Sequence, residues 1–183
     1  MRIPGTVIPE TDGRSNAQFL NGIFAATSSL MLSQIREMTG LDASALQNWV
    51  KRGWVSPPQN RRYNVDQVAR ILIINMLREA LQHEKIAFLL SYVNGSVMDR
   101  SDDIIPESKL YEYICTVAEE YRGKDVTDSE RLRAAIEKVT ADYVETTEGA
   151  SQRLRKALEI IIIAGRSIQV KRRADRLLDE IYS

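Results

Sequence analysis

Two short groups of polar and basic residues, about ten positions apart, carry side chains of the types that can hydrogen-bond to bases and phosphates. Gln47, Asn48 and Lys51 form the first group, and Arg61 and Arg62 form the second. Amide side chains can make paired hydrogen bonds to an adenine edge, whereas lysine and arginine bind phosphates or guanine. The spacing of 47, 48 and 51 puts these three on one side of a helix. We therefore expect one helix and one basic loop to contact a duplex.

The residues before and within the first group predict two short helices joined by a tight turn. Ser33 is typical of the residue that caps the start of a helix, and Gly40 suits the left-handed conformation that ends one. Asp42 or Ser44 can cap the next helix, over about 43–52. This order is that of a helix-turn-helix, in which the second helix enters the major groove.

The second group lies in a segment that predicts a small wing. Pro57 and Pro58 cannot continue a helix and favour extended backbone. We expect two short strands over about 57–63, with Arg61 and Arg62 meeting phosphates or the minor groove. The complete set of predicted DNA contacts is Ser44, Gln47, Asn48, Lys51, Arg52, Arg61, Arg62 and Tyr63.

Neither group alone distinguishes a DNA-binding surface from an ordinary solvated one. Polar residues cover the outer side of most surface helices, and exposed arginine pairs are common. The ordered combination of turn glycine, helix, Gly53, prolines and arginines favours DNA binding.

The composition argues against an enzyme. The chain of 183 residues has one cysteine, Cys115, and one histidine, His83. These numbers exclude an internal disulfide framework and a multi-cysteine zinc site, and they weaken any Ser-His-Asp proposal. Glycine-rich phosphate loops, paired catalytic carboxylates and a nucleophile elbow are not apparent. We expect no catalytic activity, no metal and no cofactor.

Charge is segregated along the chain although the net charge is zero. The net charge is +3 over residues 30–95, −7 over 96–150 and +4 over 151–183. The longest apolar run, Ile160 to Ala164, is far shorter than the roughly 20 residues of a membrane helix. The first residues lack the pattern of a signal peptide, so we expect a cytoplasmic protein without a membrane segment.

Helical periodicity continues after the wing and predicts a mainly α protein. Gly, Ser, Asp and Pro residues between Asn94 and Pro106 indicate a linker. The predicted fold is a winged helix-turn-helix followed by an all-α domain. Its parts are an N-terminal arm and short helix (1–27), a DNA-binding head (28–93), a linker (94–105) and a helical tail for dimerisation or effector binding (106–183).

The last predicted helix, over about 150–181, provides the expected subunit contact. Around Ile160–Ile163 it is apolar on all sides, so either its own domain or a second subunit should cover it all round. We expect a homodimer whose interface contains Leu158, Ile161 and Ile162.

Other side chains invite sharper interpretations, each with a simpler alternative. Four tyrosines could line the pocket of an unknown small-molecule effector, although tyrosines more often belong to the core or its boundary. Cys115 fits a buried structural thiol better than a redox sensor, and His83 fits a boundary residue. The four tyrosines are Tyr111, Tyr113, Tyr121 and Tyr143. An acidic cluster of Asp99, Asp102 and Asp103 fits a solvated linker.

Residues 30–92 resemble the DNA-binding head of the MerR-type transcription regulators. The matching residues are Leu32, Ile35, Thr39-Gly40-Leu41, Leu46, Gly53 and the proline after it, Arg61, Tyr63, Val68, Ile71, His83-Glu84-Lys85-Ile86 and Leu89-Leu90. The resemblance implies a helix-turn-helix, a wing and paired helices, with DNA bound by the recognition helix and the wing. The layout as a whole resembles a family of uncharacterised bacterial proteins that have such a head and a helical tail.

The chain departs from the MerR pattern in ways that limit what the resemblance implies. Ser44, Gln47 and Asn48 stand where that family usually has arginine, arginine and tyrosine. The wing is short, and neither the long coiled-coil dimer helix nor the effector cysteines are expected, so heavy-metal sensing is not implied.

The sequence therefore predicts a homodimeric, DNA-binding transcription regulator that reads half-sites about one helical turn apart, or a multiple of that. Two alternatives remain open. An architectural, excisionase-like protein would share the head but bend DNA with little effect on transcription. A protein–protein interaction module would use the same helices without DNA.

Overall fold

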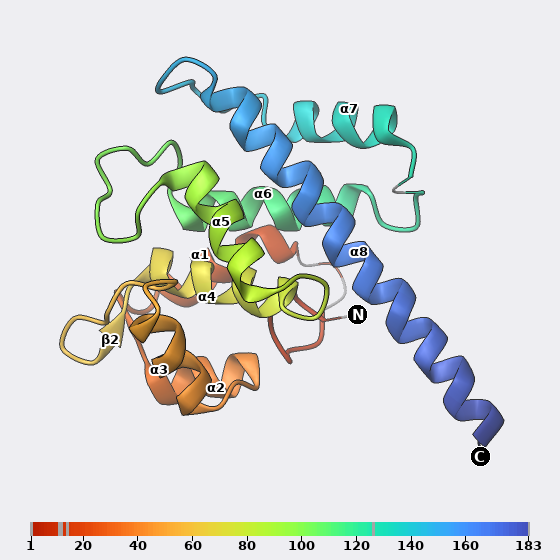
Figure 1. Ribbon diagram of the computed structural model, residues 1–183, viewed down its shortest axis with the longest axis horizontal. Coiled ribbons are helices and arrows are strands. Elements are labelled where there is room, and N and C mark those ends of the chain that lie inside the picture. The colour runs from red at the N-terminus through yellow and green to blue at the C-terminus, as the bar shows by residue number, and fades with distance from the viewer. Residues whose placement is uncertain (1, 11–12, 14, 126, 183) are drawn as a thin grey trace.

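The computed structural model describes residues 2–10, 13, 15–125 and 127–182, and it is mainly helical (Figure 1). A two-stranded sheet is its main extended element. In chain order, the elements are a short 3-10 helix, Asn16–Gln18, then α1 (Phe19–Phe24), β1 (Leu30–Met31), α2 (Leu32–Thr39), α3 (Ala43–Lys51), β2 (Arg62–Tyr63), α4 (Val65–Leu77), α5 (His83–Asn94), α6 (Glu107–Glu120), α7 (Ser129–Val139) and α8 (Ala150–Tyr182).

Helices α2 and α3 are joined by the tight turn that the sequence predicts. Gly40 has φ 70°, in the left-handed region, and its N–H donates to the carbonyl of Arg36 at 2.8 Å. Asp42 caps α3 by accepting the backbone N–H of Ala45 at 2.7 Å. Helix α2 begins at Leu32, so the expectation that Ser33 caps it was wrong. The backbone N–H of Met31, the residue before α2, instead donates to the side-chain oxygen of Gln34.

The sheet pairs two strands that come from different parts of the head. β2 runs antiparallel to β1, with Leu30 opposite Tyr63 and Met31 opposite Arg62. The expected pair of strands within 57–63 is reduced to β2 and one isolated bridge between Gln59 and Arg62. β1 therefore ties the segment before α2 to the end of the hairpin.

Helix α4 lies at the centre of the molecule and is apolar on most sides. Its core residues Val68, Ala69, Ile71, Leu72, Ile73, Ile74 and Leu77 are at most 1% exposed. It packs against α1 and α2 on the head side and against α5, α6 and α8 (Figure 1). One continuous core, from Leu20 to Ala164, thus includes both the predicted head and the predicted tail.

The predicted linker is folded onto this core. Ile104 and Ile105 are each 3% exposed. The Asn94 amide nitrogen donates to the carbonyl of Ile105 at 2.7 Å, and its oxygen accepts the N–H of Ile104 at 3.2 Å. Asp103 pairs with Arg100 at 2.7 Å, so this aspartate does not belong to a freely solvated linker.

The N-terminal segment packs against the body where the sequence predicts an arm. Ile3 is buried, and the Tyr111 hydroxyl donates to the carbonyl of Pro4 at 2.6 Å. Val7 donates its N–H to the carbonyl of Met38 at the end of α2. Gly5 allows the N-terminal segment to approach the backbone of α4 closely, because a Cβ there would lie 2.2 Å from the carbonyl oxygen of Leu72.

Helix α8 crosses the body and extends beyond it (Figure 1). Leu158, Ile161 and Ile162 are 0%, 0% and 4% exposed within a single chain. Their own domain therefore already covers these three side chains, and their part in a dimer interface stays a prediction. Ile160 and Ile163 are 37% and 40% exposed, so within a single chain the helix is not covered all round. Within the described residues, none of the helices has the length and apolar content needed to cross a bilayer.

Replacing Gly5 by alanine should detach the N-terminal segment. A Cβ would meet the backbone of α4, which cannot move without disturbing the core. We expect Gly5→Ala to lower the free energy of unfolding by more than about 1 kcal/mol, measured by denaturant titration. Gly123→Ala is the matched control, since Gly123 also has positive φ but open space around it. Equal losses for the two variants would contradict the packing argument.

Candidate nucleic-acid interface

The polar side of α3 faces solvent and its apolar side is buried. Ser44, Gln47, Asn48 and Lys51 are exposed, while Leu46 and Trp49 are 1% and 3% exposed. Burial of the apolar side therefore fixes the rotation of the helix about its axis and leaves four predicted contact residues on the surface.

Ser44 is held by the residue that caps α3. Its hydroxyl donates to Asp42 Oδ1 at 2.7 Å. This bond and the N–H of Ala45 lower the pKa of the Asp42 carboxyl, so Asp42 is ionised at neutral pH. An exposed carboxylate here favours a base-edge partner, such as a cytosine amino group, over a phosphate. From the sequence, Asp42 is expected only as a helix cap.

Arg52 lies beside the aromatic cluster that follows α3. Its guanidinium is 5.2 Å from the ring centroid of Trp54 and forms an ion pair with Glu84 at 3.5 Å. The Trp54 ring stacks on His83, with centroids 5.2 Å apart and planes 8° apart. Part of the Arg52 charge is thus balanced by α5, and His83 is a packing residue at the start of that helix.

The hairpin turns at Asn60 and Arg61, both of which have left-handed backbone conformations. Their φ values are 49° and 62°. Gln59 and Arg62 close the turn with two hydrogen bonds between their backbones, at 3.0 and 2.8 Å. Two-residue hairpins of this kind favour Asn followed by Gly. Arginine at the second position costs about 1–2 kcal/mol relative to an unstrained conformation.

Arg62 and Tyr63 follow the turn in opposite environments. The exposed Arg62 guanidinium donates from Nε to Ser29 Oγ at 2.7 Å and from Nη2 to the Ser29 carbonyl at 2.9 Å. Ser29 therefore orients this guanidinium. Tyr63 is 4% exposed. Its ring belongs to the core, so we leave Tyr63 out of the set of DNA contacts.

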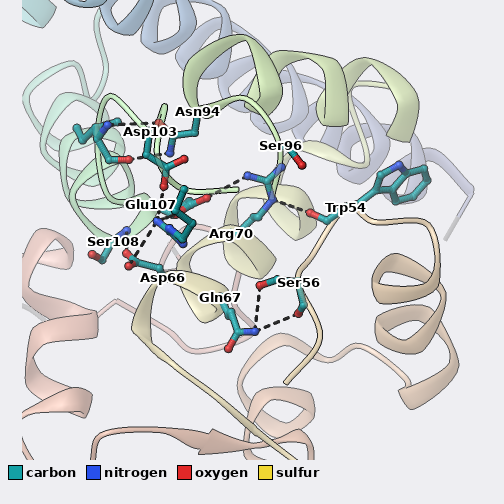
Figure 2. A network of polar contacts seen from close by, with 12 residues as sticks. Trp54, Ser56, Asp66, Gln67, Arg70, Asn94, Ser96, Asp103, Glu107 and Ser108 are labelled. Carbon is teal, nitrogen blue, oxygen red and sulfur yellow. Dashed lines mark hydrogen bonds and ion pairs between the residues drawn. The ribbon is translucent and has the colours of Figure 1, made fainter. Parts of the chain in front are cut away.

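Two residues of α4 hold the loop that leads into the hairpin (Figure 2). The Gln67 amide nitrogen donates to the carbonyls of Ser56 and Pro57 at 3.0 and 2.9 Å. Arg70 donates from Nε to the carbonyl of Trp54 at 2.6 Å. Together with the backbone N–H groups of Trp54 and Val55, which donate to the carbonyl of Trp49, these bonds to a central helix fix the path of loop 54–57.

Arg70 also forms a buried ion pair with Glu107 at the start of α6 (Figure 2). The two side chains are each 5% exposed and their closest N–O distance is 3.1 Å. Burial lowers the pKa of the Arg70 guanidinium, and the Glu107 charge opposes that shift. Arg100 reaches Glu107 at 2.7 Å and Asp66 at 3.7 Å. No local pattern in the sequence indicates this network, because its members are far apart in the chain.

The four tyrosines do not form an effector pocket. Tyr111, Tyr113 and Tyr121 are 1–3% exposed. Each hydroxyl is bonded within the fold: Tyr111 to Pro4, Tyr113 to Asp142, Tyr121 to Asp125 and Tyr143 to Ile104. Cys115 is fully buried, and burial raises the pKa of its thiol, as expected of a structural cysteine.

A cleft of about 1110 Å³ lies between the N-terminal segment, α4, α6 and α8. Isoleucines of α6 and α8 line it together with several arginines, among them Arg78, Arg122 and Arg166. The small-molecule effector stays a prediction. This cleft, which Tyr121 lines and the other three tyrosines do not, offers space for one.

The family of the chain follows from comparison with known proteins. Residues 18–114 match the model of a domain of unknown function, DUF1836, and the chain belongs to that family. Its matched segment runs from the 3-10 helix through α3, the hairpin and α4 into α6, and contains both Arg70 and Glu107. The chain is also similar to the uncharacterized protein YkrK of Bacillus subtilis (strain 168), with 23% identity over 160 residues, covering 82% of this chain and 69% of YkrK. No solved structure matches the chain.

These comparisons overturn the resemblance to MerR-type regulators. The matching family is DUF1836, and neither the MerR type nor another helix-turn-helix family is shown. The residues that carried the resemblance, such as Gly40 and Gly53, have left-handed φ values at the ends of two short helices. They specify a local turn, which unrelated families can share.

The buried Arg70–Glu107 pair should be strongly coupled. Arg70→Met alone removes the buried cation beside Glu107 and leaves Arg100, whose side chain is 45% exposed, as the remaining partner. We expect this change to cost about 3–5 kcal/mol of the free energy of unfolding. Arg70→Met combined with Glu107→Leu should cost clearly less than the sum of the two single changes. Denaturant unfolding of the four proteins measures this coupling, and additive costs would contradict it.

Proposed function

We propose that this protein binds double-stranded DNA through α3 and the hairpin, used as a winged helix-turn-helix. The observation that supports the proposal most is Arg61. A long cationic side chain stands at the hairpin tip, in a conformation that glycine adopts at lower cost. Backbone strain of this kind persists mainly where the side chain serves a function. A cation exposed at a loop tip can reach a phosphate or enter the minor groove.

The exposed side of α3 supports the same role. Gln47 and Asn48 carry amides that can bind base edges, and Lys51 adds a cation toward the hairpin. Figure 1 shows α3 and the β2 hairpin at the same end of the molecule. Arg62, oriented by Ser29, adds a second cation there. The combination offers base readout from the helix and phosphate binding from the loop.

In this proposal the protein acts in the cytoplasm as a transcription regulator. An architectural role in bending DNA is the first alternative, and a bending assay on a selected site separates the two. A protein–protein module is the second. In that case replacing Arg61 and Arg62 by alanine leaves partner binding intact, and selection from random oligonucleotides enriches no duplex.

Replacing Arg61 by glycine should separate stability from binding. Arg61→Gly creates the Asn-Gly pair that this turn prefers, so we expect the free energy of unfolding to stay unchanged or rise by up to about 1 kcal/mol. Affinity for a selected duplex should fall roughly tenfold, and the slope of log affinity against log salt should lose about 1. Fluorescence anisotropy at several salt concentrations measures both.

Arg131→Ala is the matched control for this experiment. Arg131 is an exposed cation on α7, so the variant loses the same charge far from the proposed interface. Equal loss of affinity in both variants would indicate a general charge effect and count against the hairpin.

Gln47 and Asn48 should determine which sequence is preferred. We expect Gln47→Ala or Asn48→Ala to reduce discrimination at one base position by about 1–3 kcal/mol, because a base-edge contact is lost. Binding to unrelated DNA should change little. Randomised-oligonucleotide selection with the wild type and each variant tests this; an unchanged preferred sequence in both variants would exclude these side chains from base readout.

A further inference from the structure

The exposed end of α8 carries an apolar stripe with regular spacing. Positions 160, 163, 167, 170, 174, 177 and 181 alternate in steps of three and four residues, and all but Ser167 are apolar. We call its last four members, Val170, Ala174, Leu177 and Ile181, the α8 stripe. Val170, Leu177 and Ile181 are 67%, 52% and 80% exposed, and every residue of 169–182 is exposed.

Alternating steps of three and four are the pattern of a helix that packs against another helix along one seam. Figure 1 shows that this end of α8 projects from the body. Near the start of this projecting segment, Arg172 donates from Nε to Glu79 at 3.1 Å and so ties the helix to the body. A stripe of aliphatic side chains on a projecting helix is costly in water, so a partner helix should cover it.

We infer that the partner is a second copy of this chain, and that the two α8 helices pair in antiparallel orientation. The proposed register places Val170 opposite Ile181 of the partner subunit, and Ala174 opposite Leu177 of the partner subunit. Two-fold symmetry repeats both layers, so each layer pairs a smaller side chain with a larger one.

The charges beside the stripe select this register. Residues next to the seam pair across an antiparallel contact, and Arg173 comes to lie opposite Glu180 of the partner subunit. Symmetry repeats this pair, giving two attractive contacts. Lys171 lies opposite Leu178 of the partner subunit, where its aliphatic stem can cover the leucine.

The competing arrangements bring like charges together. A parallel pair places Arg166 opposite Lys171 of the partner subunit. An antiparallel pair shifted by one heptad places Arg173 opposite Arg173 of the partner subunit. It also places Lys171 opposite Lys171 of the partner subunit. Like charges at such positions are destabilising. Of the three arrangements, the proposed register is the one that places opposite charges, Arg173 and Glu180, beside each other across the seam.

This dimer does not depend on DNA binding, and its contact is short. Four layers bury less surface than a standard stable interface, so we expect a dimer that dissociates on dilution. Because the contact lies at the tip of α8, substitutions there leave the core of each subunit intact.

A charge-reversal cycle measured by sedimentation equilibrium tests the inference. Arg173→Glu and Glu180→Arg should each weaken the dimer roughly tenfold, because two attractive pairs become repulsive. The double variant Arg173→Glu/Glu180→Arg should restore wild-type dimerisation. Leu177→Glu should abolish the dimer, and circular dichroism checks that each variant is folded.

Arg176→Glu is the matched control. It makes the same charge change on an exposed residue away from the seam, and dimerisation should be unchanged. A wild-type chain that is monomeric at all concentrations would overturn the inference. So would a dimer that Leu177→Glu leaves intact, or a double variant that fails to restore what the single reversals lose.

Discussion

The buried ion pair between Arg70 and Glu107 is the constraint on which the arrangement of this molecule depends. An arginine stays charged even when buried, so its guanidinium must find partners inside the protein. It finds Glu107 at the start of α6 and the carbonyl of Trp54 in the loop before the hairpin. The same side chain therefore positions the tail against the central helix α4 and fixes the path of the loop that presents the hairpin (Figure 2).

The hairpin combines a fixed base with a strained tip. Gln67 and Arg70 hold the loop below it, and Ser29 holds Arg62 beside it. At the tip, Arg61 adopts a backbone conformation in which glycine would be more stable. A turn that retains a charged side chain at this cost sacrifices a small part of its stability. That trade-off is what the proposed contact with DNA would explain.

Local signals in the sequence predicted local structure but not the family. Gly40 and Asp42 specify a helix end and a helix start through backbone conformation and a single hydrogen bond. Many families that share no ancestry use the same two devices, because the physics of ending and beginning a helix is common to all of them. The resemblance to MerR-type regulators rested on such residues, whereas the match to DUF1836 covers residues 18–114.

The sequence by itself determined the helical content, the turn at Gly40 and the exposed polar side of α3, because each depends on neighbours within a few residues. Tertiary structure decided what depends on distant ones. It buried Tyr63 and covered Ile161 while leaving Ile163 exposed, although periodicity cannot distinguish adjacent isoleucines in an apolar run. It also brought Arg70 to Glu107 across 37 positions, a pairing that no local pattern encodes.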